Sequence, residues 1–80
     1  MKNEVFTIKK YGTISIEIKE MMEKNGLSRN ALARACNTRF EVINKWCSGN
    51  VEKIDADVLA RVCFVLGCTP ADIIKYHSEQ

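Results

Sequence analysis

The 80-residue sequence predicts a single all-α domain of five short helices, preceded by an extended N-terminal arm. Apolar residues recur at helical spacing between residues 14 and 77, and polar caps or glycine stops divide that stretch into helical segments. Residues 5–18 show instead the period of two that favours extended chain. A chain this short buries roughly 60% of its unfolded surface and supports one core. We therefore expect an arm at residues 1–13 and a compact helical domain at residues 14–77.

The composition is that of a globular domain rather than a disordered or membrane-spanning chain. Hydrophobic residues make up 46% and charged residues 28% of the sequence, a balance typical of folded domains. No apolar run approaches the roughly 20 residues that span a bilayer. The first ten residues (MKNEVFTIKK) lack the apolar region and small residues of a signal peptide. We expect a cytoplasmic protein without a membrane partner.

The net charge is only +2, but the positive charges gather on one segment. Residues 27–50 contain four cationic residues and one acidic residue, Glu41, which gives that segment a local charge of +3. The four cations are Arg29, Arg34, Arg39 and Lys45. A basic excess on one element favours contact with phosphate groups.

The four cysteines are more typical of buried apolar positions than of a metal site or disulfides. They are Cys36, Cys47, Cys63 and Cys68, and their spacing contains no Cys-x-x-Cys pair. The single histidine, His77, lies near the end of the chain, so a zinc site has too few ligands. We expect reduced thiols that act as small hydrophobes, with disulfides and a metal or redox site as the alternatives. The sequence therefore predicts neither a metal nor another cofactor.

The N-terminal stretch is expected to lead into the first helix. Within residues 5–18, apolar and polar residues alternate on either side of Tyr11-Gly12. This pattern is typical of a short hairpin or, as we prefer, of an extended arm. The first helix begins near residues 15–18 and ends near Lys24, because Asn25-Gly26 supplies a C-terminal stop. Its expected apolar face consists of Ile14, Ile18, Met21 and Met22.

Two short helices follow with a sharp break between them. Ser28 can cap the second helix, and Asn37 tolerates the left-handed conformation that ends one. Thr38 with Glu41 three residues later fits a capping box, which would start the third helix at once. The second helix is expected to pack through a narrow face of small residues, formed by Ala31, Leu32 and Ala35. The buried face of the third is expected at Val42 or Ile43 together with Trp46, before Ser48-Gly49 ends it.

The remaining sequence predicts two further helices. Asp55 is the expected N-cap of the fourth, and Gly67 ends it. The expected buried stripe of the fourth helix is Leu59, Val62, Cys63 and Leu66. Thr69-Pro70-Ala71-Asp72 reads as a second capping box with proline at the first helical position. The fifth helix is expected to cover residues 70–77 and to bury Ile73, Ile74 and Tyr76.

Two short helices joined by a tight turn, here residues 28–48, describe a helix-turn-helix. The residues Leu27-Ser28, Leu32-Ala33, Asn37, Ile43 and Gly49 resemble, at the same spacing, the Cro/CI-type (XRE) domain of phage repressors and small bacterial regulators. Downstream, LARVCFVLGCTPADII resembles the last two helices of that lambda-repressor-like domain, so the likeness covers roughly residues 14–75. The whole string also resembles small regulators found beside glycopeptide-resistance genes. The resemblance implies a transcription regulator that binds double-stranded DNA.

The sequence departs from the family pattern at three places. Glutamine is frequent at the position of Arg29, and glycine at the position of Asn37. The start of the family's recognition helix is rich in Ser, Thr and Gln, whereas Arg39-Phe40-Glu41 stands here. The resemblance therefore implies nothing about which DNA sequence is preferred.

A recognition helix contacts bases through its N-terminal part. The candidate base contacts are Arg39, Phe40, Glu41, Val42, Asn44 and Lys45. Arg39 is suited to contact guanine. Glu41 is suited either to contact cytosine or to complete the capping box with Thr38. Phe40 is suited to contact a thymine methyl or a protein partner. The candidate phosphate contacts are Ser28, Arg29, Asn30 and Arg34, of which Arg34 also fits a solvated surface charge.

The sequence-based hypothesis is a sequence-specific regulator that acts as a homodimer. Phe64 and Val65 lie off the expected buried stripe and are the candidate dimer interface. The alternative is a protein-interaction module on the same fold, such as an antitoxin or an antagonist of another regulator. We expect no enzymatic activity, since one histidine and no glycine-rich phosphate loop leave no catalytic constellation. No small-molecule effector site is evident from the sequence.

Overall fold

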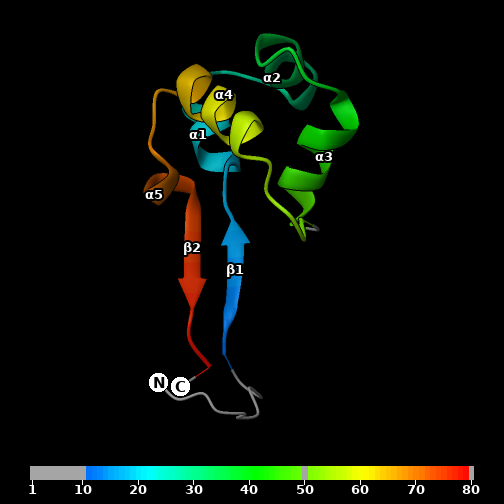
Figure 1. The fold of residues 1–80 in the computed structure, drawn as a ribbon. Coiled ribbons are helices and arrows are strands. Elements are labelled where there is room, and N and C mark those ends of the chain that lie inside the picture. Colours follow the sequence, from blue (N-terminus) through cyan, green and yellow to red (C-terminus); the bar gives the residue numbers. More distant parts are fainter. Residues whose placement is uncertain (1–10, 50, 80) are drawn as a thin grey trace.

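A computed structural model describes residues 11–49 and 51–79, in which five helices form one body and two strands form a ribbon that extends from it (Figure 1). The elements are β1 (Thr13–Ile16), α1 (Lys19–Lys24), α2 (Arg29–Ala35), α3 (Phe40–Ser48), α4 (Ala56–Leu66), α5 (Pro70–Ile73) and β2 (Ile74–His77). The predicted five-helix architecture is confirmed. Most of the expected N-terminal arm lies outside the described residues.

The β ribbon is the part of the fold that the sequence did not predict. β1 and β2 pair antiparallel, so segments from the two ends of the chain lie side by side (Figure 1). The paired residues are Thr13 with His77, Ile14 with Tyr76, Ser15 with Lys75, and Ile16 with Ile74. Two expectations are therefore wrong. The fifth helix stops at Ile73 instead of residue 77, and Ile14 belongs to β1 instead of the apolar face of the first helix.

The outer end of the ribbon depends on a close approach between its strands. Gly12 has a φ of 90°, and a Cβ at this position would clash with the carbonyl oxygen of His77. The Tyr76 hydroxyl donates a hydrogen bond of 2.7 Å to the carbonyl oxygen of Tyr11. Glycine is therefore required here both by the backbone conformation and by the lack of space.

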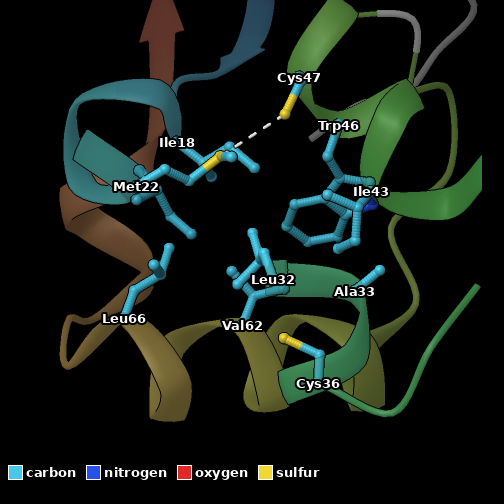
Figure 2. Close-up of a cluster of buried hydrophobic side chains, with 11 residues drawn as sticks. Ile18, Met22, Leu32, Ala33, Cys36, Ile43, Trp46, Cys47, Val62 and Leu66 are labelled. Carbon is cyan, nitrogen blue, oxygen red and sulfur yellow. Dashed lines mark hydrogen bonds between the residues drawn. The ribbon is translucent and has the colours of Figure 1, made fainter. Parts of the chain in front are cut away.

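The core lies between the helices and is lined by one face of each. Figure 2 shows Leu32, Ile43 and Trp46 directed toward the side chains of α1 and α4. The buried residues are Ile18, Met22, Leu32, Ala33, Cys36, Ile43, Trp46, Cys47, Val62, Leu66 and Ile73. The predicted burial of Trp46 is confirmed.

Three details of the predicted faces differ from the structure. On α2, Ala33 is buried beside Leu32, whereas Ala35 is exposed. On α4, Leu59 and Cys63 are only partly buried at the edge of the stripe. Tyr76, expected to be buried, is exposed on β2.

Most of the predicted helix caps are confirmed. The Ser28 hydroxyl accepts a hydrogen bond of 3.1 Å from the main-chain N–H of Ala31, and the Asp55 carboxylate accepts from Asp57 and Val58. Thr69 and Asp72 form the predicted capping box, with Pro70 in the first turn. These caps satisfy N–H groups that would otherwise lack a helical partner.

Two of the four cysteines pack in the core as small hydrophobic side chains, as predicted. Cys36 and Cys47 are buried, and the Cys47 thiol donates to the Met22 sulfur at 3.6 Å (Figure 2). Burial raises the pKa of both thiols, and nearby cationic side chains offset only part of that effect. Both thiols are therefore neutral at pH 7. Within residues 11–49 and 51–79, no helix is long and apolar enough to cross a membrane.

Candidate nucleic-acid interface

The turn between α2 and α3 is built from the end of α2. The N–H of Asn37 donates to the carbonyl of Arg34 at 3.1 Å, and the N–H of Thr38 donates to the carbonyl of Ala33 at 2.9 Å. Together these bonds form a Schellman motif, in which the residue beyond the cap takes the left-handed conformation. Asn37 does so with a φ of 54°. The prediction that Asn37 ends this helix is confirmed.

The predicted capping box at Thr38 and Glu41 is wrong. The main-chain N–H of Thr38 is already bonded to the end of α2 in the Schellman motif. The third helix, α3, therefore begins one residue later than predicted, and its N-cap is Arg39, which has extended backbone (φ −76°, ψ 148°). Among the residues that the structure describes, no side chain caps the start of α3. Because the exposed Glu41 carboxylate is not the partner of Thr38, it is not held at the helix start.

A second contact on this turn comes from α4. Arg61 Nη1 donates to the carbonyl oxygens of Asn37 at 2.9 Å and Cys36 at 3.3 Å. Its Nη2 lies 2.9 Å from a carboxylate oxygen of Asp57, one helical turn earlier. The sequence analysis missed Arg61, since the only local signal was the four-residue spacing to Asp57.

The candidate base-contacting residues lie on the outer side of α3 and at its start. Ile43, Trp46 and Cys47 pack into the core, so the opposite face of the helix faces solvent. The exposed candidates are Arg39, Phe40, Glu41 and Lys45, and the half-buried candidates are Val42 and Asn44. The bend at residues 36–39 separates α2 from α3 (Figure 1). The side chains of Arg39 and Lys45 are both exposed.

The candidate phosphate-contacting residues lie along α2, with Ser28, Arg29 and Asn30 at its start and Arg34 in its last turn. Ser28, Asn30 and Arg34 are exposed. Arg29 is half-buried, and its Nη1 donates a short hydrogen bond to Asn44 Oδ1 on α3. The structure therefore brings together two residues that the sequence analysis placed in different groups.

The flank of α3 that faces away from Arg29 borders an open groove. Val42, Lys45 and Trp46 form its α3 side, and the connection to α4 adds the cationic Lys53. Lys53 was not singled out from the sequence, because it lies outside the regular helical pattern. The groove places two cations beside α3, but Glu52 and Asp55 also line it, so its lining carries no net positive charge.

The candidate dimer residues differ in exposure. Phe64 is 87% exposed on α4, whereas Val65 is half-buried against the core. A phenylalanine this exposed leaves nearly its whole ring in contact with water, which is unfavourable in an isolated domain.

Comparisons with known proteins agree with this arrangement. A candidate DNA-binding protein from Bacteroides fragilis superposes with a TM-score of 0.68 at 22% identity, over 79% of this chain and 100% of that one. The transcriptional regulator VanUg superposes with a TM-score of 0.65 at 19% identity, over 96% of this chain and 100% of that one. No curated protein matches the chain. Residues 17–79 match a family model, and because this match spans most of the sequence, the chain belongs to the family of Cro/C1-type HTH DNA-binding domains.

Proposed function

We propose that this DNA-binding domain acts as a sequence-specific transcriptional regulator that inserts α3 into the major groove. The observation that carries the proposal is the exposed outer face of α3, which begins with Arg39 and continues through Glu41 and Lys45. The major groove, about 12 Å wide, admits one helix. The buried face of α3 holds the helix on the domain while the outer face remains available to bases.

The side chains at the start of α3 suit direct reading of base pairs. Arg39 can donate two hydrogen bonds to guanine O6 and N7, Glu41 can accept one from cytosine N4, and Phe40 can contact a thymine methyl. Val42, Asn44 and Lys45 follow along the same part of the helix. Each good bidentate contact discriminates by about 1–3 kcal/mol.

A second group of residues would hold the DNA backbone. Ser28 and Asn30 are exposed at the start of α2, and Arg34 is exposed in its last turn. Arg29 is hydrogen-bonded to Asn44 on α3. Contacts from such residues to phosphates fix the register of the protein on DNA without selecting a sequence.

Selection of bound sequences from a random duplex pool tests this assignment. Arg39→Ala should relax the consensus at one base pair, because a base contact is lost. Arg34→Ala should weaken binding to every sequence, because an exposed phosphate-contacting side chain is lost. Lys24→Ala, which removes an exposed cation from α1, is the matched control for the change in charge. A uniform loss of affinity in both arginine variants, with the consensus unchanged, would show that Arg39 does not read a base.

The proposed regulator binds as a homodimer. One small domain makes few base contacts, and helix-turn-helix proteins gain affinity by binding two half-sites about 34 Å apart. Phe64, together with Val65, offers an apolar surface for the second copy. Sedimentation with a selected duplex should show two protein copies per site, and Phe64→Asp should reduce this to one. One copy per site in the unaltered protein would exclude the dimer.

A protein-interaction module on the same fold is the second candidate. Phe40 supports it, since it is 39% exposed at the start of α3 and could contact an apolar partner. Salt dependence separates the two functions. DNA binding weakens steeply with salt, by about 0.9 in log K per log unit of salt for each neutralised phosphate.

A further inference from the structure

Arg61 connects α4 to the turn that precedes α3. Its Nη1 donates to two successive carbonyl oxygens of that turn, those of Cys36 and Asn37. Its Nη2 is held by Asp57 at 2.9 Å. Because the guanidinium is planar and rigid, these contacts fix the turn relative to the axis of α4.

The turn needs such a restraint more than a glycine turn would. Asn37 adopts a φ of 54°, a conformation that asparagine tolerates better than other residues with a Cβ but less freely than glycine. The carbonyls of Cys36 and Asn37 are oriented by this conformation, and both face the same guanidinium nitrogen. Neighbouring residues anchor each side of the contact, since Cys36 and Val62 are both buried in the core (Figure 2).

We propose that Arg61 is a positioning residue for DNA binding, which holds the start of α3 at the angle required to enter the groove. The proposal rests on the function proposed above. In this role Arg61 acts through the turn, by the bonds to its carbonyls, rather than by contacting bases or phosphates. Sites built from several side chains need them held within about 0.5 Å of the productive geometry, so a small rotation of α3 would disturb all base contacts together.

The test compares DNA affinity with stability in the full chain. Affinity for a selected duplex is measured at a temperature at which circular dichroism shows each variant to be folded. Arg61→Ala should bind about tenfold more weakly, a loss similar to that of one bidentate base contact. The DNA affinity of Arg61→Lys should lie between that of the unaltered protein and that of Arg61→Ala, since an ammonium cannot reproduce the planar geometry of the guanidinium. Lys24→Ala, which has the same change in net charge, should bind normally.

A second substitution separates positioning from stability. Asn37→Gly relieves the left-handed conformation and should raise the melting temperature of Arg61→Ala. It should leave the affinity low, because the restraint from α4 is still missing. Recovery of affinity together with stability would overturn the proposal, as would unchanged affinity in folded Arg61→Ala and Arg61→Lys.

The outcome also distinguishes this proposal from the proposed function. If the unaltered protein selects no DNA sequence, the proposed function fails. If it selects a sequence and the Arg61 variants bind that sequence equally well, only the positioning role fails. Should Arg61→Ala not fold, the comparison of Arg61→Lys with the unaltered protein decides the question.

Discussion

The helix-turn-helix at residues 28–48 and the ribbon formed by β1 and β2 differ in the origin of their contacts. In the helix-turn-helix, the bonds that end α2 join residues three to five positions apart. In the ribbon, the Ser15 hydroxyl meets His77 Nε2 at 2.7 Å across 62 positions, and Tyr76 reaches Tyr11 across 65. The end of α2 is therefore specified mainly by local bonds, to which Arg61 adds a distant contact, whereas the ribbon exists only once distant segments of the chain have met.

The two regions also differ in how they are stabilised. α2 and α3 bury one face each in the core. The outer ribbon lacks such cover, since Ile14 and Tyr76, which pair across the strands, are both exposed. A two-stranded sheet is marginally stable by itself. We expect substitutions in the first region to act on the whole domain and those in the second to act locally.

The largest expected difference comes from one substitution made in both regions. Ile43→Ala removes a fully buried side chain from α3, and core changes of this kind cost about 2–5 kcal/mol. Ile14→Ala removes a side chain that is 56% exposed and should cost less than about 1 kcal/mol. Urea unfolding measures both free energies. Similar losses would show that the ribbon is part of the cooperative core.

A smaller effect is expected from Gly12→Ala at the outer end of the ribbon. The added Cβ would meet the His77 carbonyl, and the left-handed backbone adds strain of about 1–3 kcal/mol. Because the ribbon can open while the helices stay folded, amide exchange should accelerate at Ser15 and Lys75 but not within α3.

Gly26→Ala is the matched control for this prediction. Its φ of 65° is also left-handed, but no atom lies within 4 Å of the added Cβ. It should therefore leave exchange in the ribbon unchanged. If Gly12→Ala instead accelerated exchange throughout the helices, the ribbon and the helical body would unfold as one unit.

The caps show how far the sequence could predict this structure. Ser28, Asp55 and Thr69 were identified because each cap satisfies N–H groups two or three residues away. The strand at residues 74–77 was missed because the short run Ile-Ile-Lys-Tyr-His fits a helix, and only the distant β1 decides against it. Arg61 was missed for the same reason, since its partners lie 24 and 25 positions away.

The candidate interface was predicted better than its internal contacts. The outer face of α3 follows from helical periodicity, so the exposure of Arg39 and Lys45 could be expected. The hydrogen bond between Arg29 and Asn44 could not, because it depends on how α2 and α3 cross. The capping pair at Thr38 failed because two local motifs competed for that residue, and the end of α2 prevailed.

That competition predicts a difference between two alanine substitutions at helix starts. Ser28→Ala removes a hydroxyl that caps α2 and should cost about 1 kcal/mol. Thr38→Ala leaves the main-chain bond to Ala33 intact and should change stability by less than about 0.5 kcal/mol. Thermal unfolding of both variants measures the difference. An equal loss in Thr38→Ala would restore Thr38 as a cap of α3.

The smallest expected effect is a pH dependence at the start of α5. Hydrogen bonds from the main-chain N–H and hydroxyl of Thr69 lower the pKa of Asp72. Since the folded pKa lies below the unfolded value, the ionised carboxylate stabilises the fold above about pH 4. This contribution is lost as the pH falls through the lowered pKa.

The melting temperature of Asp72→Asn should therefore lie below that of the unaltered protein at neutral pH, and the gap should narrow in acid. Thr69→Val, which removes only the hydroxyl bond, should show a smaller gap with the same direction. A gap that is independent of pH would mean that Asp72 contributes through packing or geometry rather than through its charge.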